Sequence, residues 1–125
     1  MSITYNFEIS VSKKEGISSI HIIESLLEAG WSLYSEKNEI IYTNVGDTDD
    51  FDFLAKTITK EEYLNIASQK EKNNEMIALA LFLLEEDYRY RIDIIITPEF
   101  NILISPDDKT KKILISNLKI LDVNW

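Results

Sequence analysis

The chain has 125 residues, an apolar content of 45% and no cysteine. A chain of this length forms one domain with its own core, and the lack of cysteine excludes disulfides, thiolate zinc sites and cysteine nucleophiles. The net charge of −9, from 22 acidic and 13 basic residues, disfavours nucleic acid and anionic membranes and favours a basic partner. We therefore expect a single soluble domain, residues 1–125. The acidic charge has an alternative explanation, because many cytosolic proteins are acidic for solubility alone.

The first part of the chain predicts a strand followed by a helix. Residues 3–11 alternate between apolar and polar side chains, which is typical of a strand with one face in water. The start of the chain lacks the basic and apolar segments of a signal peptide. Residues 17–29 change to helical spacing, with Ser18 as the N-cap and Gly30 as the stop.

A hairpin and an acidic segment follow this helix. Residues 31–35 and 40–45 indicate two strands joined by a turn at residues 36–39. The next stretch, residues 46–53, is unusual because four of its eight residues are aspartates. Charged side chains at this density do not enter a packed core, so we predict a surface loop or an extended edge here.

The second half of the chain predicts another helix and further strands. Thr59 and Glu62 have the spacing of a capping box at the start of a helix. Residues 76–84 are apolar on all sides and include two alanines, which favours a buried helix over a strand. Residues 87–97 show the clearest alternation in the chain and predict a long central strand. Its apolar side chains include Ile92, Ile94 and Ile96, and its other face includes Arg89, Arg91 and Asp93, with the arginines free to pair with Asp93 or with acids of a neighbouring strand.

A turn at residues 98–101 leads to residues 102–105, the expected antiparallel neighbour of that central strand. The tail, residues 112–125, fits a strand or a helix, and we favour a strand near residues 113–115. The fold class predicted from these elements is α+β. It comprises a mostly antiparallel sheet and two main helices, in the approximate order β-α-β-β-α-β-β followed by a strand or a helix.

The sequence offers little support for catalysis. Its single histidine, His21, lies between two isoleucines on the first helix, where we expect a partly buried structural residue. No nucleophile elbow, phosphate-binding glycine loop or paired-histidine zinc motif is present. Acid–base catalysis by two carboxylates remains open, but no spacing supports it. We therefore expect no enzymatic activity and no cofactor.

The aspartates at positions 47, 49 and 52 suggest calcium ligands, but a helix-loop-helix calcium site requires glycine at its sixth position and glutamate at its twelfth. Asp52 and Ile58 occupy those positions, so we expect no metal. Two interpretations remain, a solvated loop without a partner and a protein-binding loop with an aromatic anchor among carboxylates. The candidate binding residues are Asp47, Asp49, Asp50, Phe51 and Asp52, with Glu36 and Glu39 of the preceding turn as secondary candidates.

Three features resemble the immunity proteins of bacterial polymorphic toxins, including contact-dependent growth inhibition systems. They are the Gly-Trp-Ser-Leu step at residues 30–33, the aspartate-rich stretch at residues 46–53, and the strand that runs into the Pro98-Glu99 turn. The resemblance implies a cytoplasmic, stoichiometric inhibitor, a monomer or weak dimer, that binds the C-terminal domain of a cognate toxin. Many such toxins are nucleases with basic surfaces, which an acidic inhibitor would complement.

Two alternatives to an immunity protein remain from the sequence. One is a structural or chaperone-like module, such as a homodimer, whose acidic surface only maintains solubility. The other is a small enzyme that uses carboxylates, which we rank last.

Overall fold

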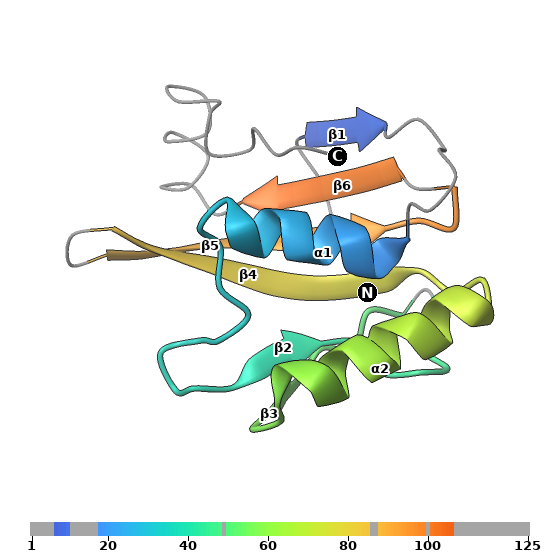
Figure 1. Ribbon diagram of the computed structural model, residues 1–125, viewed down its shortest axis with the longest axis horizontal. Coiled ribbons are helices and arrows are strands. Elements are labelled where there is room, and N and C mark those ends of the chain that lie inside the picture. Colours follow the sequence, from blue (N-terminus) through green and yellow to red (C-terminus); the bar gives the residue numbers. More distant parts are fainter. Residues whose placement is uncertain (1–6, 11–17, 49, 86–87, 100, 107–125) are drawn as a thin grey trace.

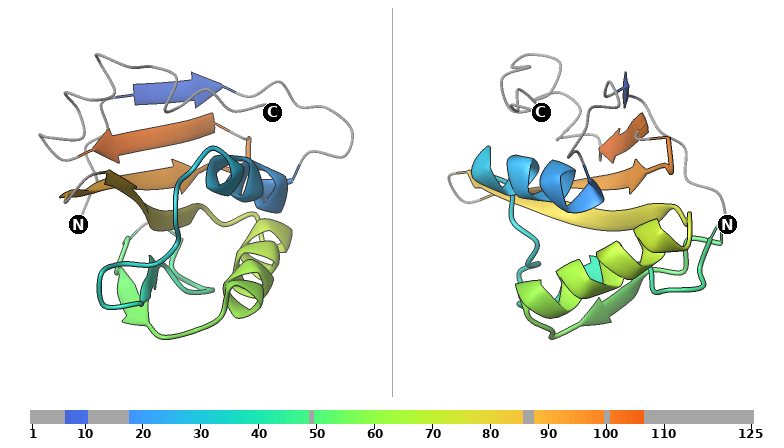
Figure 2. Two further views of the ribbon diagram at one scale, coloured as in Figure 1. Left: turned by 60° about the vertical axis from the view of Figure 1, so that its left-hand side comes forward. Right: turned by 45° about the vertical axis from the view of Figure 1, so that its right-hand side comes forward.

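The computed structural model describes residues 7–10, 18–48, 50–85, 88–99 and 101–106. The elements in chain order are β1 (Phe7–Ser10), α1 (Ser19–Glu28), β2 (Ile40–Tyr42), β3 (Leu54–Lys56), α2 (Lys60–Lys72), β4 (Ile77–Glu85), β5 (Tyr88–Ile96) and β6 (Asn101–Pro106). The strands form one antiparallel sheet in the order β1-β6-β5-β4-β2-β3, and both helices lie on the same face of it (Figures 1 and 2). The predicted α+β class, an antiparallel sheet with two helices, is confirmed.

Strand β5 occupies the interior position that its alternation predicts. It pairs with β4 on one side and with β6 on the other, so residues 102–105 are its antiparallel neighbour as expected. Ile92, Ile94 and Ile96 are buried in the core between the sheet and the helices. The core also includes Ile22, Ile23 and Leu26 of α1, Tyr63 and Ala67 of α2, and Ile77, Leu79 and Leu81 of β4.

The prediction of a buried helix at residues 76–84 is wrong, because this segment forms β4. Its nine residues are in register with β5, from Ile77 opposite Ile96 to Glu85 opposite Tyr88. Large side chains at alternate positions face the helices, and Ala78 and Ala80 on the other face are also buried. A strand buried on both faces has no polar side to reveal its period, and it resembles a buried helix in sequence.

The predicted hairpin is only partly correct. Residues 31–35 form isolated bridges, from Ser32 to Phe82 and from Tyr34 to Ile40, in place of a regular strand. The predicted turn at residues 36–39 is present, because the backbone N–H of Ser35 donates to the carbonyl of Glu39. Strand β2 lies between β4 and β3, and β3 directly follows the predicted acidic loop.

The predicted N-caps of both helices and the predicted stop of α1 at Gly30, which has a φ of 115°, are confirmed. Thr59 and Glu62 form a reciprocal capping box at the start of α2, and Ser18 accepts from the backbone N–H of His21 at the start of α1. Helix α2 ends at Lys72 with Asn73 as its C-cap, and Asn74 has a φ of 55°. The predicted strand near residues 113–115 and the ends of the predicted strand at residues 3–11 lie outside the described residues.

Helix α2 links the sheet to the other helix. Its Glu71 carboxylate accepts from the backbone N–H of Ser19, at the start of α1. Its Tyr63 ring packs edge-on against Tyr42 of β2, with ring centroids 5.6 Å apart. The last turn of α2 and the start of β4 lie beside the loop between β2 and β3, and this neighbourhood positions the acidic segment (Figure 1).

Candidate functional site

The acidic loop between β2 and β3 is organised by one of its own carboxylates. Both carboxylate oxygens of Asp47 accept backbone N–H groups, from Asp50 at 3.1 Å, Phe51 at 3.0 Å and Asp52 at 2.7 Å. Phe51 has a φ of 54°, a left-handed conformation that costs energy for a residue with a side chain. The Asp47 bonds hold the backbone in this conformation, so the loop has a defined shape.

A buried lysine ties this loop to α2. The ammonium of Lys70 donates to the carbonyl oxygens of Asn44 at 2.8 Å and Asp47 at 2.7 Å, and lies 3.3 Å from a carboxylate oxygen of Glu75. Lys70 is only 1% exposed, and Glu75 is 8% exposed. The same Glu75 oxygen accepts from the backbone N–H of Gly46 at 2.8 Å. Both ends of the ion pair therefore hold the loop backbone.

The environment of Glu75 favours its ionised form. Burial alone would raise the pKa of this carboxyl, but hydrogen bonds from Gly46, Asn73 and Lys70, together with the charge of Lys70, outweigh that effect. The pKa of Glu75 is consequently lowered from its ordinary value of 4.5. Glu75 is thus ionised at neutral pH, and the Lys70 ammonium lies beside it inside the protein.

The structure divides the predicted loop residues into two groups. Asp47 shapes the loop, whereas Asp50 and Asp52 are exposed and Phe51 is half-buried. Asp49 lies outside the described residues. The part that these residues take in binding a partner stays a prediction, but two carboxylates are in place on a fixed backbone.

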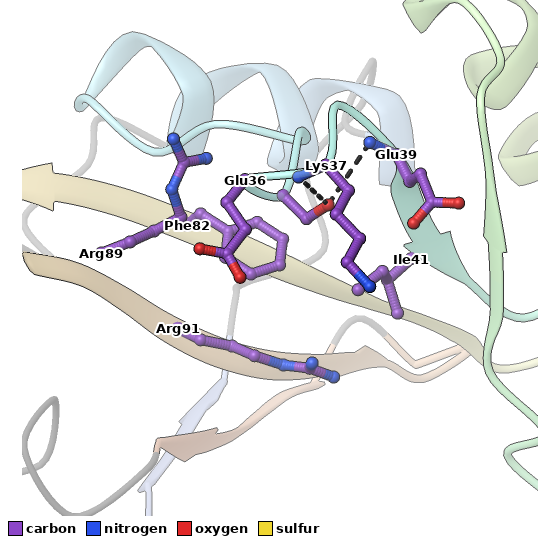
Figure 3. Close-up of a pocket in the computed structure, with 8 residues that line it drawn as sticks. Glu36, Lys37, Glu39, Ile41, Phe82, Arg89 and Arg91 are labelled. Atoms are coloured by element: carbon purple, nitrogen blue, oxygen red, sulfur yellow. Dashed lines mark hydrogen bonds between the residues drawn. The ribbon is translucent and has the colours of Figure 1, made fainter.

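Glu36 and Glu39 lie at the opposite end of β2 from the acidic loop, because the turn that carries them precedes the strand and the loop follows it (Figure 1). They belong instead to a separate cleft of about 380 Å³. Figure 3 shows the side chain of Glu36 pointing toward Phe82, whereas that of Glu39 points away from it. The two carboxylates do not converge, so this cleft lacks the carboxylate pair that acid–base catalysis by two acids requires.

The cleft brings together residues from the turn and from three strands. Arg89 and Arg91 of β5 line it, with Phe82 of β4 and Ile41 of β2. A terminal nitrogen of Arg89 donates to the carbonyl of Tyr34 at 2.8 Å. The predicted pairing of an arginine with Asp93 is confirmed, since Nε of Arg91 lies 2.8 Å from a carboxylate oxygen of Asp93.

Sequence reasoning placed both arginines on one face of the strand but did not find this cleft. The available signal was the residue type. Of the chain's 13 basic residues only Arg89 and Arg91 are arginines, and they are two positions apart. Arginine in preference to lysine indicates a need for fixed, planar hydrogen bonding.

Other predicted features have simple outcomes. His21 is exposed, so the expectation of partial burial is wrong. Its side chain follows the outer face of α1, while Ile22 and Ile23 turn inward. The described residues include no group of three or more His, Asp or Glu side chains suited to a metal ion. Neither α1 nor α2 has the length and apolar character needed to cross a bilayer.

Comparisons with protein-family models, with curated proteins and with solved structures give no match for this chain.

Proposed function

We propose that this protein is an immunity protein, which binds the C-terminal domain of a bacterial toxin and neutralises it in a stoichiometric complex. The proposal includes a basic toxin surface, such as that of a nuclease, and action in the cytoplasm without catalysis. Its main support is the acidic loop, in which exposed Asp50 and Asp52 are attached to a backbone held by Asp47 and Lys70. A loop that is ordered before binding loses little conformational entropy in the complex, which favours affinity.

The charge of the chain supports the same proposal. A net charge of −9 accelerates the approach of a basic partner and repels the polyanionic substrate of a nuclease. Phe51, half-buried between the two exposed aspartates, offers an apolar contact at the centre of the charged group. Aromatic contacts inside a polar rim are a common source of interface affinity.

The direct test is co-expression. The toxin candidate is the C-terminal domain encoded by the reading frame directly upstream, produced with and without this chain. We expect the domain to arrest growth, the chain to restore it, and the two to purify as a one-to-one complex. Toxicity that the chain does not relieve would refute the proposal.

A second test assigns the interface. Asp50→Lys and Asp52→Lys each change the charge by two units on an exposed side chain. We expect each to weaken the complex by about ten-fold or more, since a repulsive charge replaces an attractive one. Glu28→Lys is the matched control, because Glu28 is exposed at the end of α1, away from the loop. Equal effects of all three variants would mean that only total charge matters.

The competing hypothesis is a structural or chaperone-like homodimer. Sedimentation of the purified chain separates the two proposals. A stable dimer at micromolar concentration that has no affinity for the upstream domain would favour the structural module, and a monomer that binds it would favour the immunity protein.

A further inference from the structure

Strand β3 lies at one edge of the sheet. It pairs with β2 on one side, and the strand order places no described strand on its other side. Figures 1 and 2 show β3 at the rim of the sheet, next to the start of α2. An edge strand of this kind can pair with a strand of another chain. The stretch that carries the argument, here called the edge segment, is residues 52–56, Asp-Phe-Leu-Ala-Lys.

The hydrogen bonds of β2 determine which backbone groups of β3 face outward. The backbone N–H of Thr43 donates to the carbonyl of Ala78, toward β4. Successive residues of a strand direct their backbone groups to opposite sides, so Tyr42 directs its groups to its partner in β3, Leu54. The N–H and carbonyl of Ala55, the next residue of β3, therefore point away from β2, where no described strand meets them.

The edge segment carries opposite charges at its two ends. Asp52 and Lys56 are exposed, and neither side chain has an ion-pair partner among the described residues. Between them, Leu54 packs only partly on the core, and Phe53 is also half-buried. An extended backbone places residues 52, 54 and 56 on one face and residues 53 and 55 on the other.

This pattern is complementary to itself in the antiparallel direction. A two-fold axis at Leu54 sets Asp52 of each copy opposite Lys56 of the other, and the two Leu54 side chains against each other. On the other face, the ring of Phe53 meets the small side chain of Ala55. The backbone agrees with this register, because positions 53 and 55 are those whose groups alternate outward. A shift of two residues in either direction would place a charged side chain opposite Leu54.

The net charge of −9 on each copy opposes self-association. Salt at about 0.15 M screens charges that lie farther apart than roughly 8 Å, and acts less on ion pairs in direct contact. The edge segment is short, so the interface is small and the expected dimer is weak.

We propose that the edge of β3 pairs with β3 of a second copy of this chain, antiparallel about Leu54, through ion pairs between Asp52 and Lys56. The contact joins the two sheets into one continuous sheet. The inference uses only the chain's own residues and is independent of the immunity function. A dimer of this strength also differs from the stable micromolar dimer of the competing structural hypothesis.

The test is sedimentation equilibrium of the full chain in about 0.15 M salt. We expect a reversible dimer with a dissociation constant on the order of 0.1–1 mM. Asp52→Lys and Lys56→Asp should each weaken this dimer by about ten-fold or more, because like charges then face each other. Asp52→Lys also lowers the overall negative charge of each copy, which would by itself favour association. Its weakening effect therefore reports the local contact.

A mixture of the two variants tests the register. In a heterodimer of Asp52→Lys with Lys56→Asp, each base again faces an acid, so we expect recovery of about the wild-type affinity. Asp50→Lys is the matched control, because it makes the same charge change on an exposed aspartate of the same loop. In this register Asp50 faces Ile58 of the second copy, so the dissociation constant should stay within about two-fold of the wild type.

Nitrogen–proton NMR of the wild type provides a readout that needs no variant. The amide signal of Ala55 should shift as the protein concentration rises through the dissociation constant, since its outward N–H gains a hydrogen bond. Weakening by each variant alone, with recovery in the mixture, would support the proposal. A monomer at about 1 mM, an Ala55 signal independent of concentration, or equal effects of Asp50→Lys and Asp52→Lys would overturn it.

Discussion

Replacement of Lys70 by methionine tests whether its ammonium holds the acidic loop in place. Methionine keeps the length and apolar character of the side chain but removes the donor from the carbonyls of Asn44 and Asp47, which lie 2.8 and 2.7 Å away. It also leaves the Glu75 carboxylate, 8% exposed, without its ion-pair partner. Removing one partner of a buried ion pair costs about 3–5 kcal/mol of unfolding free energy. That is a large part of the roughly 5–15 kcal/mol available to a domain.

Urea unfolding followed by circular dichroism provides the measurement. With a slope typical of small domains, this loss lowers the midpoint by roughly 2 M urea. Lys72→Met is the matched control, because Lys72 is exposed in the same helical turn, and it should cost under about 1 kcal/mol. The double variant Lys70→Met with Glu75→Gln should recover part of the loss, since it no longer buries an unpaired charge. A cost below about 1 kcal/mol for Lys70→Met would refute this account of the loop.

Three further predictions follow from the same structure. The lowered pKa of Glu75 gives stability that is fully present above about pH 4.5 and is lost as the pH falls through the folded-state pKa. The unfolding free energy, measured at decreasing pH, should therefore fall more for the wild type than for Glu75→Gln. Parallel curves for the two proteins would contradict this. The buried hydroxyl of Tyr63 has no hydrogen-bond partner among the described residues, so Tyr63→Phe should be neutral or stabilising by about 1 kcal/mol in urea unfolding, and a clear loss would show a missed partner. Lys70 already donates to the Asn44 and Asp47 carbonyls, so calcium should not stabilise the loop. The melting temperature in about 5 mM calcium, enough for typical extracellular sites, should equal that in a chelator, and a rise of several degrees would disprove this.

The parts of the fold that the sequence predicted correctly are those with a local signal. The capping box at Thr59 depends on residues three positions apart, and the alternation in β5 depends on its own side chains. Strand β4 has no such signal, because its two alanines and its large apolar residues are buried on opposite faces. Helix propensities differ by less than about 1 kcal/mol per residue, which nine backbone pairs with β5 readily exceed.

The candidate sites follow the same division. The sequence identified the acidic loop by its composition, and the structure places Asp50 and Asp52 on its surface. It did not identify the cleft, whose residues come from positions 35 to 91 and converge only when Ser32 pairs with Phe82 and Tyr34 with Ile40. The bridge from Ser32 to Phe82 depends on β4, which the sequence assigned to a helix. An error in one central strand therefore concealed the pocket beside it.

The acidic loop has the aspartates of a calcium site without its motif, and the cation at its backbone is the ammonium of Lys70. In calcium sites the metal holds carboxylate and backbone carbonyl oxygens together. Here the ammonium of Lys70 lies between the carbonyls of Asn44 and Asp47 and the carboxylate of Glu75. The cation thus comes from a helix that follows the loop in sequence, and Asp47 accepts backbone N–H groups. Because these internal groups stabilise the backbone, the carboxylates of Asp50 and Asp52 remain at the surface, where a basic protein could reach them.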